Sequence, residues 1–289
     1  MNYRHHFHAG NFADVCKHVV LGRLVEAMAR KEKAFLYLDT HAGRGRYDLS
    51  VAAQGDSLAR APEWPDGIGR ILARGDAPPA VRTYVDRVRE FDRQSGHFGE
   101  GLRFYPGSPW LVKAALRPQD RMVLCELHPA EKVALAAEFH RVPRVSVLEL
   151  DGYTAVRAQL PCPERRALVL LDPPFESPDE WRQLVDGLAV GLERMPGATF
   201  AIWYPLTQRA RVEAFLAEME RRPLPPTWCA EVAIAGEDAG LKMRGSGMVV
   251  VNPPWQLDQE LGPVLAWLAE VLGRAPGAEG LLTWRVRER

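Results

Sequence analysis

The chain has 289 residues, of which 47% are hydrophobic and 26% are charged. These values are ordinary for a protein with a sizeable buried core, and the length allows about two domains or one domain with a large insertion. Its 37 basic residues balance its 37 acidic ones, which excludes nucleic-acid binding by bulk positive charge and leaves only local patches.

The sequence also indicates the cellular compartment in which the protein works. Four widely spaced cysteines include no CxxC pair, so neither a zinc ribbon nor a disulfide scaffold is indicated, and a reducing cytoplasm fits. The first residues contain no apolar stretch typical of a signal peptide, and no apolar run approaches 18 residues. We therefore expect a cytoplasmic protein with no membrane partner. Since no sign of oligomerisation is present, we expect a monomer.

Short apolar runs recur along the chain and predict buried strands. They cover residues 35–39, 122–127, 145–150, 167–172, 198–204, 231–235 and 247–252. Helical patterns lie between several of them, over residues 14–30, 109–117, 129–140, 179–194 and 207–221. This alternation predicts an α/β fold with a mostly parallel sheet, in which ligands bind beyond the carboxyl ends of the strands.

Residues 49–107 depart from this alternation of strands and helices. It has no convincing buried strand, is rich in Arg, Asp, Gly and Pro, and has helical patterns near residues 56–74 and 78–93. We therefore predict a discontinuous domain of residues 1–48 and 108–289, with 49–107 as an inserted helical subdomain.

The first strand leads into a glycine-rich loop. Asp39 ends the strand, and Gly43 and Gly45 allow a sharp turn and a close approach to a ligand. The spacing lacks the third glycine of the dinucleotide fingerprint. Arg44 and Arg46 flank this loop and are the best candidates for local phosphate contacts.

Acidic residues follow the next two strands. Glu126 stands where a carboxylate can accept two hydroxyl hydrogen bonds from a ribose. Asp151 can accept a hydrogen bond from an exocyclic adenine amine, and Gly152 leaves room for the ring. Together the three strand ends predict an adenosine-containing cofactor, without separating NAD from S-adenosylmethionine.

The fourth strand ends in Asp172-Pro173-Pro174-Phe175. Two prolines fix the backbone and remove two N–H donors, which predicts a rigid turn with outward carbonyls. A planar base with an exocyclic amine fits such a turn, because the amine can donate to Asp172 and to the Pro173 carbonyl while the ring stacks on Phe175. A second motif of similar form, Asn252 to Trp255, closes the last strand and is interpreted as a structural turn.

At these residues the chain resembles a known family. Asp-Pro-Pro-Phe after the fourth strand is similar to the signature of methyltransferases that act on exocyclic nitrogens of nucleobases. A closer resemblance, from residue 3 to about 270, is to the RlmJ family of bacterial 23S rRNA adenine-N6 methyltransferases. It rests on the motifs YRHHFHAGNFADVCKH, LYLDTHAGRGRYDL, FYPGSPWL, ELHP, DGY, LDPPFE, WYP and SGMVVVNPPW.

This resemblance implies a Rossmann-like class I methyltransferase, S-adenosylmethionine as donor and an adenine of 23S rRNA as acceptor. It implies a catalytic Asp172, which also lines the donor pocket, and RNA contacts by Tyr3, with Arg4 and His5 as neighbours. Residues implied to hold the donor are Lys17, His18, His41, Ser108, Glu126, Asp151 and Gly152. The family pattern has Tyr after the prolines; Phe175 preserves stacking but lacks the phenol hydroxyl.

Two other classes of function stay open from the residues alone. One is a methyltransferase acting on DNA adenine or on guanine N2 of rRNA. The other is a non-methylating protein that binds NAD or another nucleotide. A metal site among the N-terminal histidines is not expected, because neither an HExxH motif nor a cysteine pair accompanies them.

Overall fold

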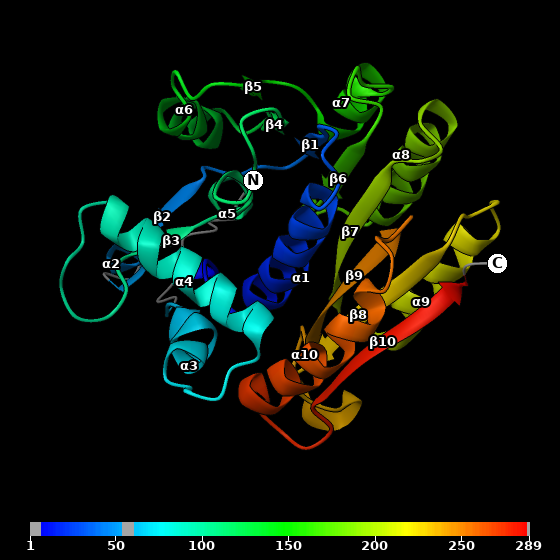
Figure 1. Cartoon of the computed structure of the whole chain (residues 1–289). Coiled ribbons are helices and arrows are strands. Elements are labelled where there is room, and N and C mark those ends of the chain that lie inside the picture. Colours follow the sequence, from blue (N-terminus) through cyan, green and yellow to red (C-terminus); the bar gives the residue numbers. More distant parts are fainter. Residues whose placement is uncertain (1–6, 54–60, 288–289) are drawn as a thin grey trace.

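The apolar runs form one eight-stranded sheet in the order β10-β8-β9-β7-β6-β1-β4-β5 (Figure 1). This computed structural model describes residues 7–53 and 61–287. The strands are β1 (Leu36–Asp39), β4 (Arg121–Cys125), β5 (Val145–Leu148), β6 (Ala167–Leu171), β7 (Thr199–Leu206), β8 (Thr227–Ala233), β9 (Gly245–Val251) and β10 (Glu279–Val286).

Strands β5, β4, β1, β6 and β7 run parallel to one another, and β9, β8 and β10 join them through antiparallel pairings. Within the described residues, four of the seven pairings in this sheet are parallel, so the predicted mostly parallel sheet is confirmed. Successive strand side chains point to opposite faces. Tyr37 therefore packs in one core cluster, whereas Leu36 and Leu38 pack in the other.

Helices cover both faces of the sheet (Figure 1). On one face lie α1 (Phe12–Ala29), α5 (Ser108–Lys113), α6 (Pro129–Glu138) and α10 (Leu257–Leu272). On the other face lie α7 (Gly152–Gln159), α8 (Glu180–Arg194) and α9 (Arg209–Glu220). Helix α1 is the most deeply embedded, with 14 of its 18 residues buried. Asn11 caps its amino end by accepting a hydrogen bond from the Asp14 backbone at 2.9 Å.

The predicted strands agree with the structure within a few residues, except that β8 begins at Thr227 instead of residue 231. Outside residues 46–107, the α-helices α7 and α10 and the strand β10 were not predicted. Leu257, Leu261, Val264 and Leu268 have the helical spacing expected of α10, but Pro263 lies inside that helix and weakens the pattern.

The segment 49–107 contains α2 (Leu49–Ala53), a short 3₁₀ turn (Trp64–Asp66), α3 (Ile68–Leu72), α4 (Pro79–Gln94) and β3 (Phe104–Pro106). Strand β3 pairs antiparallel with β2 (Arg46–Asp48), so this segment also has a short strand that was not predicted. Its apolar residues Ile68, Val81 and Tyr84 join the core cluster that surrounds α1. The division into a catalytic domain and an inserted subdomain stays a prediction.

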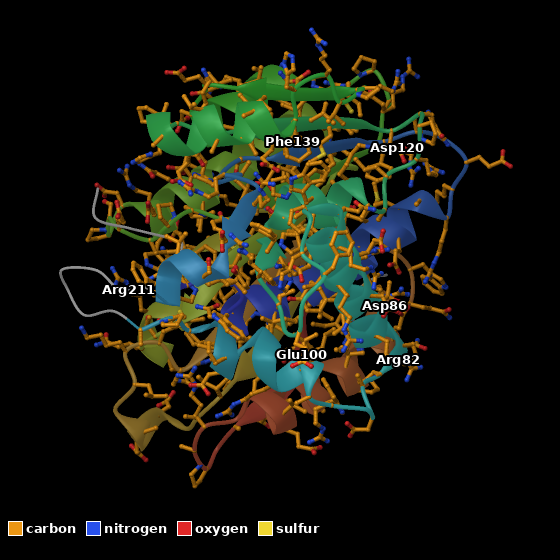
Figure 2. All side chains as sticks on the ribbon, turned by 90° about the vertical axis from the view of Figure 1, so that its left-hand side faces the viewer. Arg82, Asp86, Glu100, Asp120, Phe139 and Arg211 are labelled. Carbon is orange, nitrogen blue, oxygen red and sulfur yellow. The ribbon has the colours of Figure 1, made fainter. Side chains whose placement is uncertain are left out.

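The exposed face of α4 carries both signs of charge. Arg82 and Asp86 lie one turn apart there, and Glu100 lies in the loop beyond the helix (Figure 2). None of the described helices combines the length and apolar composition that a bilayer-spanning helix needs. Cys16, Cys125, Cys162 and Cys229 are all buried free thiols.

Candidate active site

A cavity of about 620 Å³ lies beyond the carboxyl ends of the parallel strands. Strand β1 marks the point where the order of strands reverses, with β4 and β5 on one side and β6 and β7 on the other. Ligands bind in such sheets at this crevice, and the volume suits a small molecule. The cavity brings together ten predicted site residues: Lys17, His18, His41, Ser108, Glu126, Asp151, Gly152, Asp172, Pro173 and Phe175. Tyr3, Arg4 and His5 lie outside the described residues.

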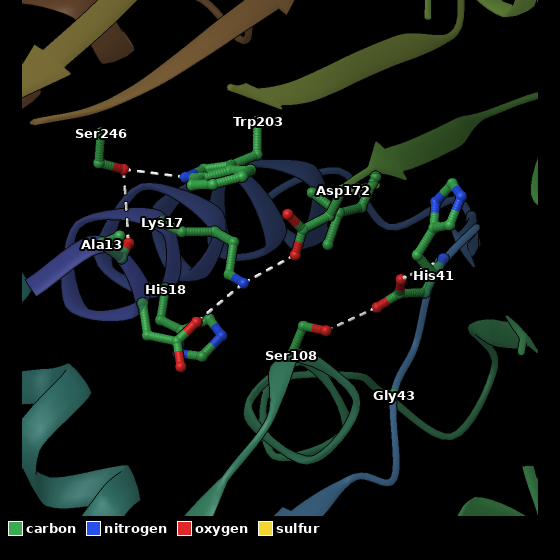
Figure 3. A network of polar contacts seen from close by, with 12 residues as sticks. Ala13, Lys17, His18, His41, Gly43, Ser108, Asp172, Trp203 and Ser246 are labelled. Carbon is green, nitrogen blue, oxygen red and sulfur yellow. Dashed lines mark hydrogen bonds and ion pairs between the residues drawn. The ribbon is translucent and has the colours of Figure 1, made fainter. Parts of the chain in front are cut away.

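A buried ion-pair group joins α1 to the end of β6 (Figure 3). The Lys17 ammonium lies 2.7 Å from Oδ2 of Asp172 and 2.9 Å from Oδ1 of Asp14. The three side chains are between 5% and 14% exposed, so water screens this group weakly. Burial lowers the pKa of Lys17, but the Asp14 and Asp172 carboxylates outweigh burial and hold the pKa well above its ordinary value. Lys17 is therefore a fixed cation.

A second carboxylate, Asp39, organises the end of β1. Its Oδ2 accepts hydrogen bonds from Ser108 Oγ at 2.7 Å and from the Tyr37 hydroxyl at 2.8 Å. Burial raises the pKa of Asp39 to about 6, although the hydrogen bonds from Ser108 and Tyr37 act in the opposite direction. Asp39 thereby fixes the hydroxyl of a predicted donor-binding residue.

The tautomer of His41 follows from its partners. The Thr40 hydroxyl donates to the Leu170 carbonyl at 2.9 Å, so it must accept the 2.8 Å hydrogen bond from His41 Nδ1. Burial lowers the pKa of His41 to about 4, so the ring is neutral at neutral pH. His41 thus carries its proton on Nδ1 and presents Nε2 as an acceptor.

The two acids at the neighbouring strand ends are held by backbone N–H groups. Glu126 accepts from Gly43 N at 2.8 Å and from His128 N at 2.7 Å. Asp151 caps α7 by accepting from Thr154 N at 2.7 Å. These bonds fix each carboxylate, and every carboxylate oxygen retains a further lone pair for a ligand.

Gly152 lines the cavity, where its predicted role is to leave room for a ligand ring, and the packing of α7 gives a second reason for a glycine there. A Cβ there would lie 2.5 Å from the Thr40 carbonyl oxygen and 2.7 Å from Thr40 Cβ. The glycine therefore allows the first turn of α7 to pack against the loop after β1.

We predict that Gly152→Ala destabilises the protein by about 1–3 kcal/mol, because the added methyl group overlaps Thr40. Gly262→Ala is the matched control, since that helical glycine has no neighbour within 4 Å of an added Cβ, and it should stabilise by about 0.5–1 kcal/mol. Urea unfolding of both variants measures the difference. Equal effects would contradict the close packing of α7 against Thr40.

The Asp-Pro-Pro-Phe turn forms an aromatic wall. Phe175 has a φ of +53°, a backbone conformation uncommon for a residue with a side chain, so the surrounding packing must hold it. Its ring centroid lies 4.7 Å from that of Trp181 and 5.6 Å from that of Trp203. Trp203 also lines the cavity, where its indole N–H donates to Ser246 Oγ at 2.9 Å (Figure 3).

The second proline motif lies elsewhere. Strand β9 is antiparallel to β7, so the residues after Val251 lie beside the amino end of β7, at the opposite end of the strands from the cavity. Asn252 donates from its side-chain amide to the Pro196 and Ala198 carbonyls, both at 2.8 Å. Its interpretation as a structural turn is confirmed.

Two features near the cavity differ from expectation or were not predicted. Arg44 and Arg46, the candidate phosphate contacts, form ion pairs with Glu131 and Glu138. Asp14 and Trp203 line the cavity without having been predicted. The only available signal for Asp14 was its position three residues before Lys17, which places the two on one helix face.

The sheet order, the cavity at its reversal point and the acidic Pro-Pro turn after the fourth parallel strand define a Rossmann-like methyltransferase. The sequence comparisons make this more specific. A family model described as "Ribosomal RNA large subunit methyltransferase D, RlmJ" matches residues 32–286. The chain belongs to this RlmJ family of ribosomal RNA methyltransferases.

Individual relatives cover the whole chain. The chain is 38% identical over 288 residues to ribosomal RNA large subunit methyltransferase J of Escherichia coli strain K12, covering 100% of both. It is 38% identical over 286 residues to the protein of the same name from Haemophilus influenzae, covering 99% of this chain and 98% of that protein. A crystal structure of a Legionella pneumophila protein matches with a TM-score of 0.83 and 30% identity, covering 98% of this chain and 99% of that one.

Proposed function

We propose that this protein transfers a methyl group from S-adenosylmethionine to the exocyclic N6 of an adenine in 23S rRNA. The observation that carries the proposal is the largely buried Asp172 carboxylate, 14% exposed, which is bound to Lys17 at 2.7 Å and followed directly by the turn that ends in Phe175. The two relatives support ribosomal RNA as the proposed substrate, because both bear the name of a large-subunit ribosomal RNA methyltransferase.

The cavity residues fit the proposed donor. Its adenosine part needs acceptors for a ribose diol and an adenine amine, and Glu126 and Asp151 supply fixed carboxylates for these. Its amino-acid part needs polar partners, which Lys17, His18, His41 and Ser108 would supply. When bound, S-adenosylmethionine supplies an electrophilic methyl group on a sulfonium.

The acceptor base would use the other half of the cavity. Within the described residues, Lys17 engages Oδ2 of Asp172, which leaves Oδ1 for an amine. A second hydrogen bond from the amine would go to the Pro173 carbonyl, and the ring would stack on Phe175. Base–aromatic stacking contributes about 1–3 kcal/mol per base, which offsets part of the cost of unstacking the base from RNA.

These contacts explain how the residues promote the reaction. The N6 lone pair is delocalised into the adenine ring, and hydrogen bonds from N6 to Asp172 and Pro173 would localise it. Orientation can contribute on the order of 7–11 kcal/mol, whereas general-base help gives about 10²–10⁴-fold. The amine proton becomes acidic only as the new bond forms. Asp172 therefore orients the amine first and accepts its proton late.

We further propose that Tyr3, with Arg4 and His5, contacts the RNA. Residues 7–11 follow that segment directly, and two of them, His8 and Asn11, line the cavity.

The proposal is tested by incubating the protein with S-adenosylmethionine and unmodified 23S rRNA and then identifying methylated nucleosides by mass spectrometry. New N6-methyladenosine is expected. N2-methylguanosine, or methylation of DNA but not RNA, would contradict the acceptor while preserving the fold and donor. Failure to bind S-adenosylmethionine, with binding of NAD instead, would overturn the proposal as a whole.

We predict that donor affinity weakens as the pH falls from 8 to 5, with a midpoint near the Asp39 pKa of about 6. Protonated Asp39 donates a hydrogen bond, so Ser108 loses a fixed acceptor. His41, with a pKa of about 4, stays neutral over most of this range. The effect of Asp39 on folding stability runs in the opposite direction from its effect on donor affinity. Because the pKa of Asp39 is higher in the folded state than in the unfolded state, its stabilising contribution is present at low pH and is lost as the pH rises through about 6.

Isothermal titration of S-adenosylmethionine at several pH values checks this prediction. Ser108→Ala is the control, since removal of the hydroxyl should reduce the affinity at pH 8 and flatten the step near pH 6. A step of the same size in Ser108→Ala would contradict the role of the Asp39–Ser108 hydrogen bond.

A further inference from the structure

In the part of the chain that the structure describes, two exposed cations near the cavity have no acidic partner. Arg211 lies in the first turn of α9, and Lys242 lies in the loop between β8 and β9. Neither side chain forms a hydrogen bond or an ion pair with the described residues. Arg209, in the same turn of α9, differs from them because it pairs with Glu213 and Glu231. Arg211 and Lys242 are therefore available to an anionic partner.

Both cations stand at the carboxyl end of β7. Helix α9 follows that strand almost directly. The Arg244 N–H donates to the Leu206 carbonyl at 2.9 Å, so the loop that carries Lys242 returns to the same end of β7. Pro205 of β7 and Met243 of this loop line the cavity. The two cations thus lie on the β7 side of the cavity mouth.

Stacked side chains link Arg211 to the aromatic wall of the acceptor half. The guanidinium carbon of Arg211 lies 5.7 Å from the Trp181 ring centroid, which lies 4.7 Å from that of Phe175. The guanidinium is therefore at most 10.4 Å, the sum of these two distances, from the ring on which the target base would stack. The Arg211 side chain also reaches the surface (Figure 2). Stacking on Trp181 restrains the guanidinium and leaves its N–H groups able to bind a phosphate.

The other side of the cavity has the opposite charge. Glu126 and Asp151 line the cavity beyond β4 and β5, on the other side of β1 from β7. Because the chain has no net charge, local differences of this kind decide where a polyanion approaches. An RNA backbone is repelled on the β4 side of the cavity and attracted on the β7 side.

We propose that Arg211 and Lys242 bind backbone phosphates of the acceptor RNA next to the target adenine, and so hold that base over the Asp-Pro-Pro-Phe turn. Contacts of this kind position a nucleic acid without reading its sequence. The inference rests on the proposed function, since it takes RNA as the acceptor. It assigns the phosphate contacts to residues other than Arg44 and Arg46, whose guanidinium groups form ion pairs within the protein.

The test measures RNA binding by Arg211→Gln and Lys242→Gln over a range of salt concentrations. Filter binding of labelled 23S rRNA should show the salt dependence of log Kd reduced by about 0.7–0.9 in each variant, the value for one lost phosphate contact. Each replacement should therefore weaken binding about fivefold at 0.1 M salt relative to the difference at 1 M salt. The KM for RNA should rise in parallel. The kcat at saturating RNA and the Kd of S-adenosylmethionine should stay within about twofold.

Two further variants separate a phosphate contact from a merely structural role. Arg221→Gln is the matched control, because Arg221 lies at the other end of α9 and pairs with Glu218. It should change neither the salt dependence nor the KM. Arg211→Lys keeps the positive charge and should keep the salt dependence, although it loses the planar group that stacks on Trp181.

An unchanged salt dependence in either Gln variant would overturn the inference for that residue, and an equal reduction in Arg221→Gln would overturn it for both. A parallel rise in the Kd of S-adenosylmethionine would also overturn it, since that would indicate damage to the cavity. If the unaltered protein methylated no RNA, the failure would be that of the proposed function, while filter binding would still test the two cations.

Discussion

Asp172→Ala is expected to lower kcat for RNA methylation by about 10³-fold or more while leaving S-adenosylmethionine affinity within a few fold. The carboxylate would supply both an orienting hydrogen bond and the late proton acceptor, and the two contributions are lost together. Asp172→Asn preserves the side-chain shape but cannot accept a proton. It should also be inactive, which separates loss of the carboxylate from loss of packing.

The second proline motif supplies the control for this experiment. Asn252→Ala should leave kcat unchanged, because Asn252 lies at the opposite end of the strands from the cavity, and should cost stability because the Pro196 and Ala198 carbonyls lose a donor. Steady-state kinetics below the melting temperature measures both variants. Full activity in Asp172→Ala would remove Asp172 from the mechanism.

Lys17→Met is expected to reduce the free energy of unfolding by about 3–5 kcal/mol, the usual cost of removing one partner from a buried ion pair. Both Asp14 and Asp172 would then be buried without their shared cation. Since the two carboxylates outweigh burial and keep Lys17 charged, this stabilisation should be fully present up to pH 10 and lost only as the pH rises through its raised pKa.

Lys132→Met gives the matched comparison. Lys132 pairs with Glu149 at 2.9 Å, but Glu149 is 59% exposed, so this pair should contribute at most about 1 kcal/mol. Urea unfolding at pH 7 and 9 measures both variants. Methylation should be lost in Lys17→Met and retained in Lys132→Met. Equal destabilisation by the two replacements would contradict the importance of burial.

Much of the site could be predicted because its residues stand at strand ends. Asp39, Glu126, Asp151 and Asp172 each follow an apolar run, and parallel strands bring such ends to one edge of a sheet. The strands themselves could be predicted from the sequence because they are buried on both faces and so form continuous apolar runs. The edge strand β10 alternates in burial and has no such run, which is why it was not predicted.

What could not be predicted are contacts between residues far apart in sequence. Nothing in the spacing shows that Tyr84 and Tyr105 meet His18, because α4, β3 and α1 are brought together only by packing. The packing reason for Gly152 was also hidden, since its neighbour Thr40 lies more than 100 residues earlier. In each case the partner is set by tertiary structure, whereas the sequence shows only the residue type.

The burial of α1 has a consequence for synthesis of the protein. Helix α1 packs against α4, α5, β6, β7, β9 and α10, the last of which ends at Leu272. At about 5–20 residues per second, a ribosome needs roughly 10–50 s to extend the chain from α1 to that point. Until then, the part of the α1 surface that packs against α10 has no partner. Helix α1, which carries Lys17 and His18, is thus synthesised early but completes its packing late. A nascent chain therefore has no complete active site until nearly all of it has emerged.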